Sequence, residues 1–155
     1  MSGFEFIYKS SSNDDLLYVD GPVIEVEITV PLPLVRYLRK SNLPAYPLMH
    51  GLAIIDTGAA ITAIDAGVLE ELGIPYIDTE LMHTVHGSAE MQMFNASANF
   101  PSLELGGISL DRVPGGSIRS ATNAGTDIIM LLGREILRNL KMTYDGPNSN
   151  VTITT

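Results

Sequence analysis

The chain has 155 residues, of which 45% are hydrophobic and 17% are charged, with a formal net charge of −9 and no cysteine. This length and hydrophobic content predict one folded domain, residues 1–155, with a core of its own. The missing cysteines exclude disulfides, thiolate zinc sites and cysteine nucleophiles, and the negative charge argues against a general nucleic-acid binder and against an anionic membrane as partner.

The N-terminal segment, residues 1–20, is predicted to be partly loose because it contains the polar stretch KSSSNDD at 9–15. It has no long apolar core, so we expect no signal peptide. No run in the chain reaches the roughly 18 apolar residues of a membrane span, and we therefore expect a soluble, cytoplasmic protein. The first predicted strand is VIEVEITV, 23–30, in which apolar and polar residues alternate.

A proline-rich connection follows at 31–50, and its four prolines leave room for one or two helical turns. The next stretch, GLAIID at 51–56, is apolar up to its last residue and predicts a buried strand. After it, DAGVLEELGIP at 65–75 predicts a short helix, with Asp65 as its N-cap and Gly73 as its C-terminal stop.

The second half of the chain is predicted to be mainly strand. Gly, Ser, Asn and Pro interrupt LMHTVHGSAEMQMF and ASANFPSLELGGISL, which is typical of strands joined by turns. DIIMLLG at 127–133 predicts another buried strand, REILRNLK at 134–141 a short helix, and MTYDG and VTITT two final strands around a turn. Many short strands with two or three short helices make all-β the expected fold class.

Asp56 is unusual because a carboxylate stands at the end of an apolar strand, where burial of its charge without partners costs several kcal/mol. Asp-Thr-Gly is also a good turn sequence, since Asp accepts hydrogen bonds from nearby backbone N–H groups and Gly tolerates positive φ. A turn cap is therefore one interpretation. The small Ala59 and Ala60 that follow leave room for a ligand, and a second apolar strand ends at Gly133. Both features favour a functional role for Asp56.

Together these stretches resemble the retropepsin-like (retroviral-type) aspartic protease family, and most closely its bacterial cytoplasmic members. In that family two apolar residues precede Asp-Thr-Gly-Ala, and a later apolar pair is followed by Gly, often Arg, and a short helix. The corresponding segments here are IIDTGAAIT at 54–62 and LLGREIL at 131–137. The resemblance covers roughly residues 23–155 and implies an acid-protease barrel with one such motif in each chain.

The resemblance implies that Asp56 is catalytic. Aspartic proteases are the standard example of two adjacent carboxylates that hold one water and share one proton, because like charges so close cannot both ionise easily. The ionised carboxylate takes a proton from the water, and the protonated one polarises the scissile carbonyl. Thr57, Gly58 and Ala59 would support this loop, and the pH profile would be bell-shaped on the acid side.

A complete site of this kind needs two chains, because the sequence contains only one Asp-Thr-Gly. The DTE at 78–80 has no glycine and does not follow an apolar strand, and Thr126-Asp127 precedes its strand. The resemblance therefore implies a homodimer in which two copies of Asp56 meet across a two-fold axis. Thr57 would brace them through cross-chain hydrogen bonds, and VTITT would be an interface strand. Extended peptides or unfolded proteins are the implied substrates, with no cofactor.

The family closes over its substrate with a β-hairpin, which we expect at roughly 81–95 with its tip at Gly87-Ser88. Met91 and Met93 would either cover the peptide or alternate into the core. The residues expected to contact substrate are His86, Gly87, Ser88, Ala60 and Leu132.

His83 and His86 also suggest a metal site. We reject it because residues three apart on a strand face opposite sides and no third ligand is near in the sequence.

Gly133 and Arg134 form the second family motif. In retroviral enzymes this arginine usually pairs with an acidic residue four positions after the catalytic aspartate, but Ala60 occupies that position here. Glu135 or Asp65 could replace it, or Arg134 could be a solvated arginine at a helix start. Beyond a peptidase, two alternatives stay open: a non-catalytic dimerisation or peptide-binding module, and a protease that waits for a partner.

Overall fold

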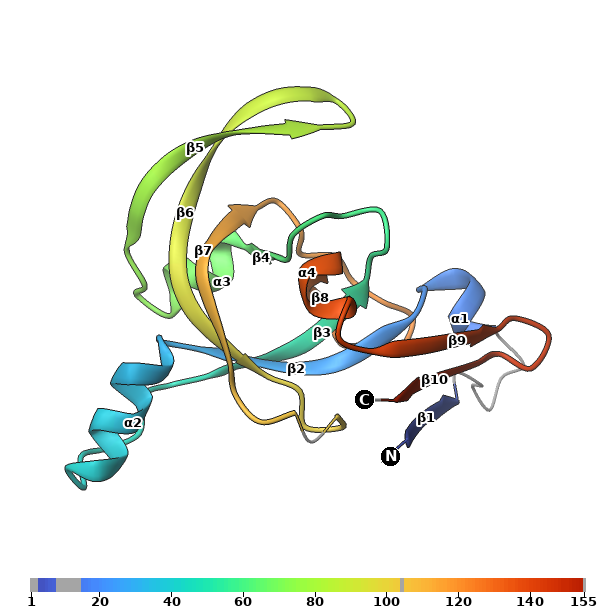
Figure 1. Cartoon of the computed structure of the whole chain (residues 1–155), viewed down its shortest axis with the longest axis horizontal. Coiled ribbons are helices and arrows are strands. Elements are labelled where there is room, and N and C mark those ends of the chain that lie inside the picture. The colour runs from blue at the N-terminus through green and yellow to red at the C-terminus, as the bar shows by residue number, and fades with distance from the viewer. Residues whose placement is uncertain (1–2, 8–14, 104, 155) are drawn as a thin grey trace.

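The computed structural model of the chain describes residues 3–7, 15–103 and 105–154 (Figure 1). Most of the polar stretch at 9–15, on which the prediction of a loose N-terminus depends, lies outside the described residues. On either side of it the chain is regular, with strand β1 at Gly3–Ile7 and helix α1 at Leu16–Val19.

One sheet of seven strands dominates the molecule. Its members are β2 (Val23–Thr29), β3 (Met49–Ile55), β4 (Ala63–Asp65), β5 (Tyr76–Thr84), β6 (Gly87–Asn99), β7 (Ile108–Gly116) and β8 (Ile128–Leu132). They follow the order β2-β3-β8-β4-β7-β6-β5, and β2 also pairs with β6. This extra pairing closes six strands into a barrel and leaves β5 outside it, so the predicted all-β class is confirmed.

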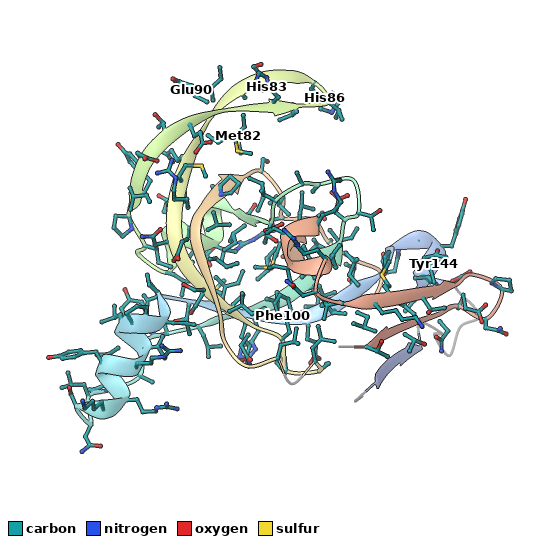
Figure 2. The ribbon with its side chains drawn as sticks, in the orientation of Figure 1. Met82, His83, His86, Glu90, Phe100 and Tyr144 are labelled. Atoms are coloured by element: carbon teal, nitrogen blue, oxygen red, sulfur yellow. The ribbon has the colours of Figure 1, made fainter. Side chains whose placement is uncertain are left out.

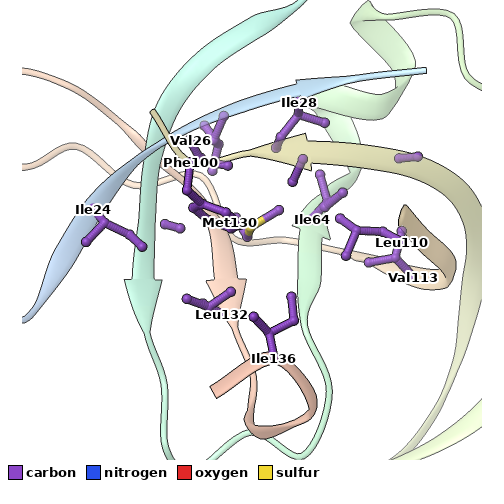
Figure 3. Close-up of a cluster of buried hydrophobic side chains, with 14 of the residues drawn as sticks. Ile24, Val26, Ile28, Ile64, Phe100, Leu110, Val113, Met130, Leu132 and Ile136 are labelled. Carbon is purple, nitrogen blue, oxygen red and sulfur yellow. The ribbon is translucent and has the colours of Figure 1, made fainter. Parts of the chain in front are cut away.

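The core fills this barrel, where alternate residues of the strands meet (Figure 3). In β2, Ile24, Val26 and Ile28 are buried and Glu25 is exposed, as expected for a strand with one face in the core. β8 is buried along almost its whole length, because it runs between β3 and β4 in the middle of the sheet. Continuous apolar sequence in β3 and β8 thus marks the centre of the fold.

The described residues contain four helices: α1, α2 (Leu32–Lys40), α3 (Ala66–Glu71) and α4 (Arg134–Leu137). α3 is as predicted, since the Asp65 carboxylate caps it at Val68 N and Gly73 follows it at φ +65°. α2 is longer than the one or two turns expected, and none of its residues is buried. None of the helices in the described ranges is long and apolar enough to cross a membrane.

A second, three-stranded sheet joins the two ends of the chain. β10 (Asn150–Thr154) lies in its middle, between β1 and β9 (Lys141–Asp145), and both pairings are antiparallel. Both edges of β10 are thus paired within the chain, and among the described residues β1 and β9 are the outer strands of this sheet. The expectation that VTITT is an interface strand of a dimer stays a prediction.

Candidate active site

The two apolar strands singled out in the sequence run side by side and end together. β3 pairs with β8 in parallel, with Ile55 opposite Leu132, and β8 pairs antiparallel with β4. The Asp56 N–H donates to the Leu132 carbonyl at 3.0 Å. The chain therefore leaves β3 at Asp56, forms a loop at 56–62, which we name the Asp56 loop, and returns as β4 on the other side of β8.

The Asp56 carboxylate is half-buried and is held by its own loop. Its Oδ1 accepts hydrogen bonds from Gly58 N at 2.8 Å and Ala59 N at 3.2 Å, so the turn geometry suggested by Asp-Thr-Gly is present. No hydrogen bond or ion pair within the described ranges engages Oδ2. A Cβ at Gly58 would lie only 3.0 Å from Oδ1, so glycine leaves the space that this carboxylate needs. One oxygen is thus fixed and the other is available.

Arg134, the first residue of α4, braces the same loop. Its Nη1 donates to the carbonyls of Thr57 at 2.7 Å and Gly58 at 2.8 Å, and its backbone N–H donates to Ala59 O at 3.0 Å. Arg134 is an exposed arginine at a helix start, as one of the two expectations has it. In the described ranges no carboxylate pairs with it; its guanidinium instead binds two backbone oxygens of the loop, which sequence alone does not reveal.

The loop is fixed further by Thr62, which had no expected role, together with Gly133 and Glu135. The buried Thr62 hydroxyl accepts from Gly133 N at 3.0 Å, and the Glu135 carboxylate accepts from Thr62 N at 2.5 Å. A Cβ on Gly133 would lie 2.3 Å from the Ile61 carbonyl carbon, so only glycine permits this approach of the two segments. Thr62 could have been noticed as a polar residue between apolar Ile61 and Ile64. These contacts make the loop and the start of α4 one unit.

A long β-hairpin formed by β5 and β6 arches over this part of the molecule in Figure 1. Its turn is at Val85-His86, because Thr84 pairs with Gly87 and His83 with Ser88. The predicted tip at Gly87-Ser88 is therefore displaced by two residues toward the C-terminus. Gly87, at φ +115°, is the position where the turn needs glycine.

Comparison with known proteins supports what this geometry suggests. A family model described as aspartyl protease matches residues 50–136, more than half of the chain. The chain belongs to the aspartyl protease family. The family is of the retropepsin-like kind, so the resemblance drawn from the sequence is confirmed. No curated protein matches the chain.

The segment that matches the family contains the Asp56 loop, the hairpin and Gly133-Arg134. Among the predicted substrate contacts, Ala60, His86, Gly87 and Ser88 are exposed. Leu132 is fully buried, so its side chain belongs to the core and not to a ligand-facing surface. The error has a simple cause: the residue before Gly133 in β8 points inward, as alternation along a strand requires.

The hairpin presents different side chains on its two faces. Figure 2 places Met82 on the side toward the barrel and His83 on the outer side. The His83 Nδ1 is 2.7 Å from the Ser88 Oγ, which links the two strands near the turn. Met93 is buried and Met91 is half-buried, so the first alternates into the core and the second lies at its margin.

Arg112 ties the base of the hairpin to β7. Its guanidinium is paired with Asp78 at 2.5 Å and Glu80 at 2.8 Å, both on β5, and its backbone N–H donates to Asn95 Oδ1 at 3.1 Å. Hydrogen bonds to Asp78 and Glu80 raise the pKa of Arg112 above its already high ordinary value. Arg112 adopts φ +58°. Sequence reasoning missed this link, although Asp78 and Glu80 fall on one face of a strand.

Asp65 is the most strongly engaged carboxylate near the loop. Burial alone would raise its pKa, but N–H donors of Arg119, Ile118 and Val68, together with the Arg119 charge, more than offset burial and lower the pKa below 3.8. Its Oδ2 accepts from Arg119 N at 2.8 Å and Ile118 N at 3.0 Å. Asp65 thus joins β4, α3 and the segment after β7. Across the described part of the chain, no three His, Asp or Glu side chains are grouped as metal ligands would be.

Proposed function

We propose that this chain is an aspartic endopeptidase that acts as a homodimer, with one Asp56 from each chain at a shared site. The observation that supports this most directly is the Asp56 carboxylate itself. Oδ1 is fixed by two backbone N–H groups, and no group of the described residues engages Oδ2, at the point where β3 and β8 end. A fixed carboxylate with one available oxygen is suited to orient a water molecule.

A second chain is needed because the chemistry uses two carboxylates. In the described ranges, the other aspartates near the motif are placed differently: Asp78 is on β5, where Arg112 holds it, and Asp127 lies just before β8. A two-fold axis beside the Asp56 loop would bring two copies of Asp56 together, since a two-fold interface apposes identical surfaces. Thr57, exposed between Asp56 and Gly58, is positioned to contact the second chain there.

In the proposed reaction, the two carboxylates share one proton and hold a water between them. The ionised carboxylate accepts a proton from the water, whose oxygen attacks the peptide carbonyl carbon, while the other carboxyl donates its proton to the carbonyl oxygen. The resulting gem-diol collapses as its C–N bond breaks: the carboxyl that took the water proton gives it to the amine nitrogen, and the other carboxylate takes a proton from one gem-diol hydroxyl. Preorganisation of Oδ1 by Gly58 N and Ala59 N limits the reorientation needed at each step.

The β5–β6 hairpin is proposed to cover the substrate. An extended peptide can add its backbone to strands of a cleft and place alternate side chains into pockets. Met82 faces the barrel side of the hairpin (Figure 2) and gives that face an adaptable apolar contact. His86, Gly87 and Ser88 near the turn and Ala60 on the Asp56 loop are the exposed candidates for substrate contact.

The test is cleavage of a diverse peptide mixture at high micromolar protein concentration, from about pH 3.5 to about 7.5, followed by mass spectrometry. Asp56→Asn is the matched variant because it keeps the shape of the side chain and removes its charge. We expect cleavage by the wild type, with a bell-shaped pH profile, and loss of at least about a thousandfold in the variant. Equal cleavage by both proteins would contradict the proposal. A folded dimer that cuts nothing would favour a peptide-binding module instead.

A further inference from the structure

Helix α2 (Leu32–Lys40) stands apart from the rest of the molecule. It projects from one side of the barrel (Figure 1), and none of its residues is buried. Large apolar side chains are exposed along it and along the loop that returns to β3: Leu34, Tyr37, Leu43, Tyr46 and Leu48. These side chains come from one continuous stretch of the chain, residues 34–48, and among them Tyr46 is tied back to the rest of the molecule, through a hydrogen bond from its hydroxyl to Leu72 O at 3.0 Å. Exposed apolar side chains concentrated in one segment point to an interaction site.

The charge of this element is opposite to that of the chain. Between Glu27 and Asp56 there is no acidic residue, while α2 carries Arg36, Arg39 and Lys40, in a chain of formal net charge −9. Throughout the described ranges, no ion pair or side-chain hydrogen bond engages these three cations. They are therefore free to pair with a carboxylate from outside.

Two of these cations line a groove, which we name the α2 groove. It has a volume of about 340 Å³ and lies between α2 and strands β2 and β6. Arg36 and Arg39 line it together with apolar Leu32, Val35 and Leu48.

Glu27, also in the wall of the α2 groove, is already engaged by Asn99 Nδ2 at 2.9 Å and lies 3.6 Å from His50. The groove thus combines free guanidinium groups with an apolar surface, and its one carboxylate has partners of its own.

We propose that the α2 groove binds an acidic, extended segment of another polypeptide. Carboxylates of that segment pair with Arg36 and Arg39, because guanidinium groups match carboxylates in geometry as well as in charge. Its apolar side chains contact Leu32, Val35 and Leu48. A bilayer fits less well, because the site is concave and the acidic remainder of the chain is repelled by an anionic surface.

The α2 groove is separate from the Asp56 loop. α2 precedes β3 and Asp56 follows it, so the two sites lie at opposite ends of a seven-residue strand, a separation of about 20 Å at roughly 3.3 Å per residue. A segment bound at α2 leaves the Asp56 loop accessible. The proposal therefore does not depend on catalysis, and its test uses binding alone.

The test measures fluorescence anisotropy of a labelled peptide rich in Glu, Asp, Leu and Phe, with Asp56→Asn protein so that cleavage cannot remove the probe. The control ligand is a peptide of the same sequence in which Gln replaces Glu and Asn replaces Asp. Arg36→Glu/Arg39→Glu is compared with Arg138→Glu/Lys141→Glu, which changes the net charge equally at exposed positions elsewhere. Circular dichroism verifies that both double variants are folded.

We expect the acidic peptide to bind more tightly than its neutral control. Arg36→Glu/Arg39→Glu should weaken the affinity for the acidic peptide by at least about tenfold, and Arg138→Glu/Lys141→Glu by less than about threefold. Equal weakening by both variants would show unspecific charge attraction and overturn the proposal, as would absence of binding. Binding of phosphatidylglycerol vesicles without peptide binding would assign α2 to membranes. A fall in the protein's own sedimenting mass in the α2 variant would assign the groove to a second copy. Either result would also overturn it.

Discussion

The Asp56 loop and the β5–β6 hairpin lie on the same side of the barrel in Figure 1, but they are held in different ways. The loop is fixed by the buried Thr62, by Gly133 in close contact with Ile61, and by Arg134 on two carbonyls. In the hairpin, β5 is exposed along almost its whole length and β6 is exposed near the turn; β6 pairs with β7 only from Met93 onward, and Arg112 adds surface ion pairs to β5. Elements with few buried contacts open at low free-energy cost. We therefore expect a rigid loop and a movable hairpin.

The largest expected effect comes from breaking the close contact under the loop. Gly133→Ala places a Cβ 2.3 Å from the Ile61 carbonyl carbon, where backbone must shift. We expect a loss of about 3 kcal/mol or more in the free energy of unfolding, at the upper end for overpacking. Chemical denaturation measures it. Gly146→Ala is the control, because its Cβ would meet only Tyr144 at 3.4 Å; similar losses in both variants would disprove the contact's importance.

Asp65→Asn should be next in size, at about 2 to 3 kcal/mol, because an amide cannot accept from Ile118, Arg119 and Val68 as the carboxylate does. The pKa of Asp65 is lowered in the folded state, so its contribution is complete above 3.8, the ordinary value, and is lost as pH falls through the lowered pKa. Urea midpoints between pH 7 and about pH 2 measure this.

The exposed Glu90→Gln is the control for that series. A difference between Asp65→Asn and wild type that stays constant down to the lowest pH would contradict the pKa assignment.

Arg134→Met should cost less stability, about 1 to 2 kcal/mol, because the arginine is exposed and its hydrogen bonds compete with water. It removes both hydrogen bonds to the carbonyls of Thr57 and Gly58, so the proposed catalysis should fall through kcat, by about tenfold or more, with little change in KM. Arg134→Lys should restore part of kcat. If Arg134→Met lost stability but kept kcat, the brace would be structural only.

The smallest effect on stability is expected at the hairpin. Arg112→Gln removes exposed ion pairs with Asp78 and Glu80, and such pairs contribute little. We expect thermal unfolding close to that of the wild type, and a KM for peptides that rises severalfold with kcat nearly unchanged. Added salt should raise the wild-type KM toward that of the variant, because it screens these charges. A wild-type KM that does not depend on salt would contradict the proposed role of the Arg112 ion pairs in substrate binding.

How far the sequence predicts the site depends on how local each feature is. Asp56, Gly58 and Gly133 follow from short motifs at the ends of apolar strands, and the helix at 66–71 follows from its Asp65 cap. Register and distant pairing are not local. The predicted hairpin turn, Gly87-Ser88, lies two residues beyond the observed turn, Val85-His86, because a glycine can stand either in a turn or directly after it.

The features that sequence reasoning missed depend on contacts between distant segments. Arg134 binds backbone oxygens, which have no signature in sequence. Arg112 meets Asp78 and Glu80 only across β6. The central position of β10 likewise depends on which strands become neighbours. These are tertiary choices that composition and periodicity do not determine.

The most direct test of the central claim, one Asp56 from each of two chains, is a subunit-mixing experiment. Wild-type protein is refolded together with a ninefold excess of Asp56→Asn protein, and its peptide cleavage is compared with wild type refolded beside the same mass of an inert protein. If each site needs two aspartates, only about one wild-type chain in ten finds a wild-type partner, and activity should fall to about a tenth. Undiminished activity would contradict the account, because it would show that a single Asp56 is sufficient.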